Sequence, residues 1–142
     1  MSNAKVKLLI VDDDEPVRES LSQLFTEFGH SVRSAEDGSS ALLEIRREVP
    51  DIVLSDLNMP GMSGFEFLSV VRRRFPSIRV IAMSGAFSVD DIPRGVAADA
   101  FYEKGPKLSL LLQIVQAMIS EEQSTALHHR APPPMQNCAE LA

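Results

Sequence analysis

Polar side chains suited to phosphate or metal chemistry directly follow several short apolar runs of this 142-residue chain. The run "LLIV" passes into three consecutive aspartates, and "DIVLS" (51–55) passes into Asp56 and then Asn58. If these runs are strands of one parallel sheet, the residues at their carboxyl ends gather at one edge, where such sheets bind ligands. The residues that the sequence places there are Asp12, Asp13, Asp14, Asp56, Asn58, Ser84 and Lys104.

The carboxylates of this set indicate a divalent cation. Aspartates packed closely together repel one another, so at least one binds a proton or the group shares a cation. Mg²⁺ fits best because it prefers oxygen ligands and typically takes one or two protein carboxylates together with a phosphate oxygen. Asp13, Asp56 and a main-chain carbonyl near Asn58 are the expected ligands. Carboxylates held beside such a metal-bound phosphodonor form aspartyl phosphates, so Asp56 is the central candidate.

Each of these residues also has an ordinary structural explanation. Asp56 stands at a strand end before a Pro–Gly loop, where an aspartate is usually a turn residue. Asp13 or Asp14 can cap a helix, and Ser84 can start a turn. Lys104 can simply be exposed. Their coincidence at one edge favours a functional site over a set of separate structural roles.

Five apolar runs are predicted to be the strands that position these residues. They are residues 6–11, 31–35, 51–55, 79–83 and 100–103. Helical patterns alternate with them over short connections, which predicts right-handed crossovers and a parallel sheet covered by helices on both faces. With five strands, the flavodoxin-like order 2-1-3-4-5 is expected. The fold class is therefore α/β, a single (βα)5 domain over residues 1–121, followed by a flexible tail or truncated linker over 122–142.

The first three helices have recognisable ends. An apolar face over residues 17–28 stops at Gly29, a natural left-handed cap. The second helix ends before Pro50, and the third starts with a capping box of Ser63 and Glu66 and is stopped by Pro76. The faces expected to be buried comprise Val17, Leu21, Leu24, Phe25 and Phe28 in the first helix, Ala41, Leu42 and Ile45 in the second, and Phe65, Leu68 and Val71 in the third.

The last two helices differ in quality. Residues 88–98 contain Pro93 and Gly95, so a fourth helix there is expected to be short or irregular. A clear amphipathic pattern then begins at Leu108 and is expected to end near Ser120 or Glu121.

Composition argues against several classes of protein. A net charge of −6 and a pI near 5.0 disfavour direct nucleic-acid binding, which depends on basic side chains. The basic run 72–74 falls in a predicted last helical turn and is expected to be solvated. The single cysteine, Cys138, suits a reducing cytoplasm, and no segment has the length of a membrane span. His128 and His129 have no further ligands at useful spacing and are expected to be surface residues.

Four motifs in order, "LLIVDDDEPVR", "VLSDLNMPGMSGFEFL", "VIAMSGA" and "FYEKGP", resemble the receiver domain of two-component response regulators. The resemblance runs from about Lys7 to Ile119. It implies a phosphorylation switch in which a sensor histidine kinase or phosphotransfer protein is the phosphodonor and a downstream target protein, or an effector domain outside this chain, receives the signal. The implied roles are phosphoacceptor for Asp56; metal site for Asp12, Asp13, Asp56 and the main-chain carbonyl of Asn58; phosphoryl contacts for Ser84 and Lys104; and switch aromatic for Phe101.

Two features depart from the family's pattern. Its lysine is usually followed directly by a proline in a cis bond, whereas Gly105 separates Lys104 from Pro106 here and leaves that geometry open. The segment between Ser84 and Lys104 is also about two residues shorter than the resemblance implies. Gly85 is small, however, which keeps the approach to the acceptor open.

Three hypotheses compete on these grounds. The first is the phosphorylation switch, with no catalysis beyond the Mg²⁺-dependent gain and loss of its own phosphoryl group. The second is a small phosphohydrolase that uses Asp56 as nucleophile, but the sequence has no cap insertion and no obvious acid for a leaving group. The third is a pseudo-receiver that binds partners without phosphate. The complete acidic set favours the first.

Overall fold

The computed structural model describes the backbone of residues 5–85, 97–105 and 108–130, and side chains within these ranges up to residue 120. Residues 88–96 of the predicted fourth helix, the peptide bond before Pro106, and Cys138 lie outside the described residues. The side chains of His128 and His129 do so as well.

Five parallel strands form one sheet in the order β2-β1-β3-β4-β5, which confirms the flavodoxin-like prediction. The strands are β1 (Lys7–Val11), β2 (Ser31–Ala35), β3 (Ile52–Asp56), β4 (Arg79–Ser84) and β5 (Ala100–Glu103). Asp56 lies opposite Met83, and Ser84 lies opposite Glu103, so the last residues of β3, β4 and β5 reach the same edge.

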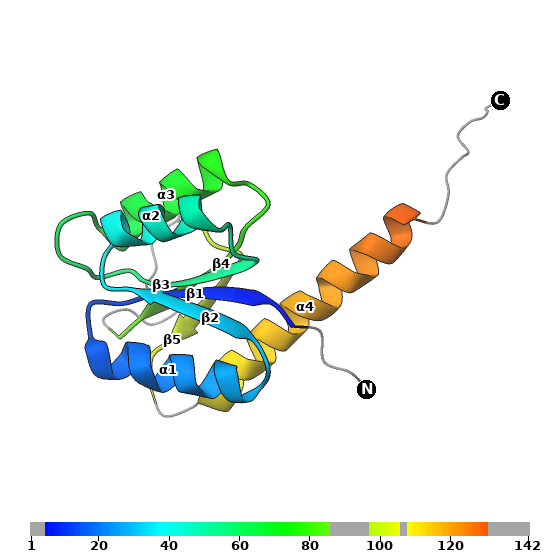
Figure 1. Cartoon of the computed structure of the whole chain (residues 1–142), viewed down its shortest axis with the longest axis horizontal. Helices are drawn as coiled ribbons and strands as arrows, with labels where there is room; N and C mark the ends of the chain where they lie inside the picture. The colour runs from blue at the N-terminus through cyan, green and yellow to red at the C-terminus, as the bar shows by residue number, and fades with distance from the viewer. Residues whose placement is uncertain (1–4, 86–96, 106–107, 131–142) are drawn as a thin grey trace. The chain divides into compact units, whose positions relative to one another are not determined.

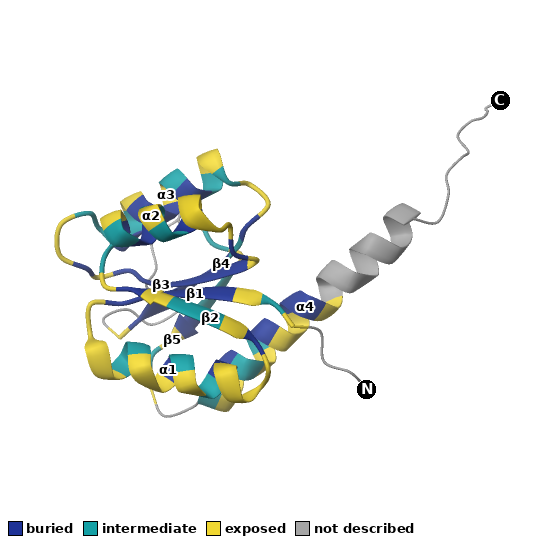
Figure 2. Cartoon of the chain, viewed as in Figure 1, coloured by how far each residue is buried: buried dark blue, intermediate teal, exposed yellow. Residues whose placement is uncertain are grey.

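Three helices cover the two faces of this sheet. Helices α2 (Gly38–Arg47) and α3 (Gly64–Arg74) lie together on one face, and α1 (Glu15–Glu27) lies on the other (Figure 1). Alternate residues of a strand point to opposite faces, so each central strand serves two apolar layers. In Figure 2 the buried residues run along the strands and along the inner sides of the helices.

The layer beneath α2 and α3 contains the larger contiguous core. Leu9, Val53 and Val80 of three neighbouring strands pack there with Ile45 of α2 and Phe67 of α3. All five residues are 0 % exposed. This core fixes β1, β3 and β4 beside one another, and these are the strands that precede the acidic residues and Ser84.

The expected helix ends are largely confirmed. Gly29 follows α1 with a φ of 94°, in the left-handed region that favours glycine. Ser63 and Glu66 form both bonds of the capping box at α3. Asp14 is the N-cap residue of α1, but its side chain makes no capping hydrogen bond.

One expectation about the buried faces is wrong, and another is confirmed only in part. Phe28 is the C-cap residue of α1, beyond the regular helix, and it is 50 % exposed rather than part of the buried face. In α3 the fully buried aromatic residue is Phe67, whereas Phe65 is only partly buried at the side of the core. Residues two apart lie on different sides of a helix, and the buried stripe of Phe67, Leu68 and Val71 is the one that faces the core, which leaves Phe65 at its side.

The basic run at the end of α3 is not wholly solvated. Arg73 and Arg74 are exposed, as expected, but Arg72 pairs with Asp99 at 2.8 Å. The same Asp99 oxygen accepts a hydrogen bond from the Val80 N–H at 2.7 Å. Arg72 therefore links the end of α3 to the beginnings of β4 and β5.

The chain divides into two units, residues 1–108 and 109–142, and α4 (Leu108–Arg130) supplies the described part of the second. This helix continues to Arg130, well past the expected end near Ser120 or Glu121. No glycine or proline interrupts residues 121–130, so polarity alone does not stop the helix. The proposed boundary between a domain at 1–121 and a tail at 122–142 stays a prediction. No helix in the described parts of the chain has the length and hydropathy of a membrane span.

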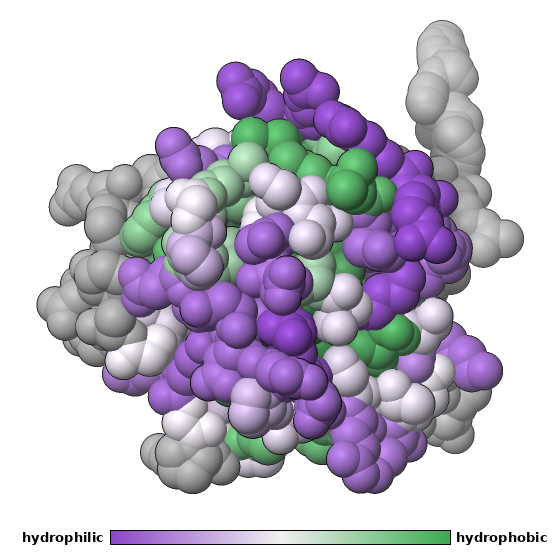
Figure 3. Space-filling model, turned by 60° about the vertical axis from the view of Figure 1, so that its left-hand side comes forward, coloured by the Kyte–Doolittle hydropathy of each residue, from purple (hydrophilic) through white to green (hydrophobic). Residues whose placement is uncertain are grey.

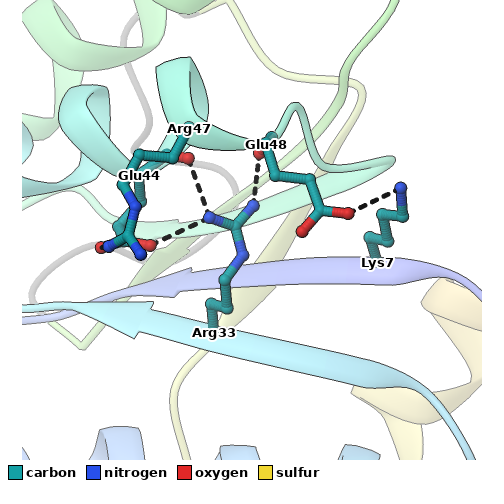
Figure 4. A network of polar contacts seen from close by, with 5 residues as sticks. All are labelled: Lys7, Arg33, Glu44, Arg47 and Glu48. Atoms are coloured by element: carbon teal, nitrogen blue, oxygen red, sulfur yellow. Dashed lines mark hydrogen bonds and ion pairs between the residues drawn. The ribbon is translucent and has the colours of Figure 1, made fainter.

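Arg33 of the edge strand β2 caps the carboxyl end of α2 (Figure 4). The Arg33 guanidinium donates to the Glu44 carbonyl at 2.8 Å, to the Glu44 carboxylate at 2.9 Å and to the Glu48 carbonyl. Lys7 of β1 pairs with the Glu48 carboxylate at 2.8 Å. The last carbonyls of a helix have no partners within it, and α2 has no glycine cap. Arg33 supplies these partners from the neighbouring strand.

We expect His30 to make the stability of the fold depend on pH. His30 is 8 % exposed, and its Nδ1 accepts a hydrogen bond from the Val6 N–H at 3.3 Å. Burial lowers the pKa of His30 below its ordinary value. The unfolded chain therefore takes up this proton at a higher pH than the folded chain, and stability is lost as pH falls through the ordinary histidine pKa.

Urea unfolding between about pH 7.5 and 5.5 tests this, because most carboxylates stay ionised in that range. His30→Gln is expected to flatten the fall in the free energy of unfolding. An equally steep fall in wild type and variant would assign the pH dependence to other groups.

Candidate functional site

The acidic residues predicted from the sequence meet at the carboxyl edge of the sheet. Asp12 directly follows β1 and its N–H donates to the Ala35 carbonyl at 3.1 Å, so it continues the β1–β2 ladder by one bond. Asp56 is the last residue of β3. Asp12 and Asp56 are 0 % and 4 % exposed, whereas Asp13 is exposed. The site thus has a buried floor of two carboxylates and one carboxylate at its rim.

One oxygen from each of Asp12, Asp13 and Asp56 lies within 4.8 Å of the others. The two buried carboxylates also have local hydrogen bonds: Asp12 Oδ1 accepts from the Asp14 N–H at 2.9 Å, and Asp56 Oδ1 accepts from the Asn58 N–H at 3.1 Å. These bonds orient the Asp12 and Asp56 carboxylates, whose Oδ2 atoms both lie near Lys104 Nζ. Three converging carboxylate oxygens are a donor set that fits Mg²⁺.

Lys104 lies across the two buried carboxylates. Its Nζ is 2.6 Å from Asp12 Oδ2 and 3.0 Å from Asp56 Oδ2. Among the described residues, Asp12 Oδ2 accepts no hydrogen bond of good geometry, so this contact is chiefly one of charge. Burial would lower the pKa of Lys104, but its contacts with the Asp12 and Asp56 carboxylates outweigh burial and raise the pKa above its ordinary value. Lys104 therefore stays charged at neutral pH and partly neutralises the acidic cluster.

The backbone on either side of the cluster is also tied to the sheet. The Lys104 N–H donates to the Ser84 carbonyl at 2.8 Å, and the Leu57 N–H donates to the Met83 carbonyl at 2.9 Å. Ser84 is 2 % exposed at the end of β4. Asn58 is exposed in the loop that follows β3. The structure thus brings all the predicted site residues at strand ends to one edge.

Phe101 occupies a different place from the acidic cluster. It lies on β5 opposite Ala82, and it packs against the core beneath α2 and α3 while remaining partly exposed. Its neighbour Tyr102 points to the other face, as strand alternation requires.

Gly64 is a residue of the site that the sequence reasoning missed. A Cβ atom there would lie 2.3 Å from the Asp56 carbonyl oxygen and 2.4 Å from the Leu57 Cα. The first turn of α3 therefore rests directly on the backbone of Asp56, and the Gly64 N–H donates to the Leu57 carbonyl at 3.1 Å. The sequence feature that could have indicated this close approach is a glycine at the first position of α3, directly after the Ser63 cap.

We expect Gly64→Ala to destabilise the fold by about 1–3 kcal/mol, because the added methyl group forces backbone to move against backbone. Gly85→Ala is the matched control, since a Cβ at Gly85 would meet, among the residues that the structure describes, only Lys104 side-chain carbons at 3.7 and 3.8 Å. Urea unfolding of both variants measures the difference. Equal stability of the two variants would mean that the close approach at Gly64 is easily relieved.

A second residue missed by the sequence reasoning is Arg18 of α1. Its guanidinium donates to the Asp12 carbonyl at 2.7 Å, which fixes the backbone that enters the acidic cluster.

Figure 3 brings the edge of the sheet that carries this cluster partly forward. Hydrophilic residues cover much of that face, and hydrophobic surface gathers mainly at the level of α2 and α3.

Comparison with known proteins gives a consistent result. A family model described as "Response regulator receiver domain" matches residues 8–116. The response regulator MprA of Mycolicibacterium vanbaalenii is 34% identical over 116 residues, which cover 80% of this chain and 50% of the relative. The response regulator protein FleR of Pseudomonas aeruginosa is 38% identical over 84 residues, covering 59% of this chain and 18% of the relative. The chain spans about half or less of the length of these relatives.

Solved structures agree in fold. The chemotaxis protein CheY4 of Vibrio cholerae superposes with a TM-score of 0.73 at 30% identity, covering 80% of this chain and 98% of that one. The response regulator TrrA of Thermotoga maritima, solved in complex with Mg(2+)-BeF, gives a TM-score of 0.72 at 29% identity over 80% of this chain and 98% of that one. With its acidic cluster, its sheet order and the family match over most of its length, this chain belongs to the response regulator receiver domain family.

Proposed function

We propose that this receiver domain is a phosphorylation-dependent switch of a two-component system, with Asp56 as the phosphoacceptor. One observation carries the proposal above all. The Asp56 carboxylate ends a buried strand, keeps one oxygen on its own loop and directs the other toward a lysine and two further carboxylates. That arrangement holds a nucleophile beside both a cation site and an ammonium group.

The proposed metal site consists of Asp12, Asp13, Asp56 and the main-chain carbonyl of Asn58. Bound Mg²⁺ would neutralise charge on the transferring phosphoryl group and draw its oxygens toward Asp56. Asp13 is the proposed direct ligand at the rim because it is the exposed member of the cluster. Asp12 is held by its own hydrogen bond and by Lys104, and it completes the negative charge of the site.

In the proposed reaction, an Asp56 carboxylate oxygen attacks the phosphorus of a phosphohistidine on a sensor kinase or phosphotransfer protein. The O–P bond forms as the N–P bond to the donor histidine breaks, and the electron pair returns to the imidazole, which takes up a proton. Lys104 and Ser84 are proposed to bind the phosphoryl oxygens. Because Lys104 already contacts Asp56, it needs little movement to reach a group attached there.

The signal is proposed to be transmitted by a partner that binds the surface altered by phosphorylation. Contacts of the phosphoryl group with Ser84 and Lys104 favour one arrangement of the β4–β5 region, and Phe101 is the proposed switch aromatic there. The downstream partner is a target protein or an effector domain. The net charge of −6 favours protein contacts over direct nucleic-acid binding by this domain, and the cysteine usage favours a cytoplasmic setting.

Acetyl phosphate with Mg²⁺, followed by intact mass measurement, tests this function. We expect the chain to gain the mass of one phosphoryl group only when Mg²⁺ is present, and to lose it on treatment with hydroxylamine, which cleaves acyl phosphates. No mass gain under these conditions would contradict the proposal and favour a phosphate-independent interaction module.

A further inference from the structure

The turn that carries Lys104 is fastened at two points on either side of the lysine side chain. The first is the main-chain bond from the Lys104 N–H to the Ser84 carbonyl. The second follows the lysine: the Tyr102 hydroxyl donates to the Gly105 carbonyl at 3.4 Å. Lys104 thus lies between two attachments to the sheet, one through β4 and one through the tyrosine of β5.

Open space borders this turn on one side. Lys104 and Gly105 border a cavity of about 310 Å³ whose other walls include Val17, Leu21 and Met83. The Lys104 side chain is 23 % exposed. A lysine stem is flexible, and open space on one side gives it several alternative rotamers. Its placement on Asp12 and Asp56 therefore depends on where the backbone of residues 103–105 is held.

Tyr102 is well suited to hold that backbone. Tyr102 is 3 % exposed, and it pairs with Met83 in the β4–β5 register. A buried phenol ordinarily finds a hydrogen-bond partner, and the partner here is the residue directly after the lysine.

Within the part of the chain that the structure describes, neither the backbone angle of Gly105 nor its neighbours require a glycine at this position. Its φ is not in the left-handed region, and among the described residues a Cβ there would approach only the Glu103 carbonyl, at 4.0 Å. What Gly105 contributes to the turn is its carbonyl, the acceptor of the Tyr102 hydroxyl.

We propose that Tyr102 is a positioning residue, which fastens the turn after Lys104 through the Gly105 carbonyl and so keeps the ammonium group on Asp12 and Asp56. The expected effect on the rate of labelling rests on the proposed function. The expected effect on Mg²⁺ affinity does not depend on phosphorylation. A lysine held on two carboxylates competes with any metal ion for them.

The test is Tyr102→Phe in the full chain, which removes the hydroxyl and keeps the buried ring. Two readouts are measured: Mg²⁺ affinity by isothermal titration calorimetry without phosphodonor, and the initial rate of labelling by acetyl phosphate at saturating Mg²⁺. The expected changes are a tighter Mg²⁺ complex and slower labelling, each by roughly twofold to fivefold, the effect of losing one neutral hydrogen bond. General damage to the site would instead weaken both.

Lys104→Ala gives the reference for a lost ammonium group and is expected to change both readouts in the same directions by a larger factor. In the double variant, Tyr102→Phe is expected to add nothing to Lys104→Ala, because the tyrosine acts only through the lysine. Ser20→Ala is the matched control, since it removes a hydroxyl from another wall of the same cavity and is expected to leave both readouts unchanged.

Three results would overturn the inference: unchanged Mg²⁺ affinity in Tyr102→Phe, a parallel loss of affinity and labelling, or additive effects in the double variant. A wild-type chain that binds Mg²⁺ but is never labelled would contradict the proposed function alone, because the titration still reports on Lys104. A wild-type chain that binds no Mg²⁺ would contradict both.

Discussion

Asp56→Asn is expected to abolish phosphorylation by acetyl phosphate, with no mass gain at any Mg²⁺ concentration. An amide is nearly the same size as a carboxylate but lacks the nucleophilic oxygen that forms an acyl phosphate. The fold is expected to survive the change. Lys104 also contacts Asp12 at 2.6 Å, so its charge keeps a partner when the charge of Asp56 is removed. Intact mass and urea unfolding measure the two parts of this prediction.

Asp51→Asn is the matched control for that experiment. Asp51 directly precedes β3 at the opposite end of the same strand, is exposed, and accepts a hydrogen bond from the Lys7 N–H. The Asp51→Asn variant is expected to be phosphorylated to the same extent as the wild type. A hydroxylamine-labile phosphate on Asp56→Asn would place the acceptor elsewhere and refute the assignment.

Asp13→Ala is expected to remove most Mg²⁺-dependent labelling while leaving the stability of the fold nearly unchanged. Asp13 is the exposed member of the three-carboxylate cluster, so its loss leaves no buried group unpaired. A missing carboxylate ligand is expected to weaken Mg²⁺ binding by about tenfold or more, since even residues that only support a ligand contribute on that scale. Calorimetric Mg²⁺ titration and the rate of labelling measure the change.

Asp14→Ala controls for the loss of one negative charge nearby. Asp14 adjoins Asp13, is also exposed, makes no side-chain capping bond to α1 and does not belong to the cluster. Labelling that falls equally in the two variants would indicate a general electrostatic effect. Labelling that is unchanged in Asp13→Ala would exclude Asp13 as a ligand.

The sheet and the position of the acidic cluster could be predicted because they follow from local patterns. Each strand is a short apolar run closed by a polar residue or a turn, and parallel strands bring their ends to one edge. Asp56 illustrates this: its place after the run 51–55 was sufficient to put it at the end of β3, beside the end of β1.

What escaped prediction depends on contacts between residues far apart in sequence. Lys104 was placed at the correct edge, but its simultaneous contact with Asp12 requires the distances in the folded chain. In the sequence Arg33 is an unremarked residue of a polar strand, yet in the fold it caps the carboxyl end of α2. Gly64 needs no side chain because Asp56 and Leu57 lie against it, and no sequence period encodes that approach.

The tyrosine beneath the Lys104 turn has a practical consequence, because the chain contains one tyrosine and no tryptophan. Its near-ultraviolet fluorescence therefore arises from a single ring, with phenylalanine contributing little. That ring is buried, and its hydroxyl touches the residue next to Lys104. The emission of Tyr102 therefore reports on the surroundings of Lys104, and stopped-flow fluorescence can follow changes there without an attached dye.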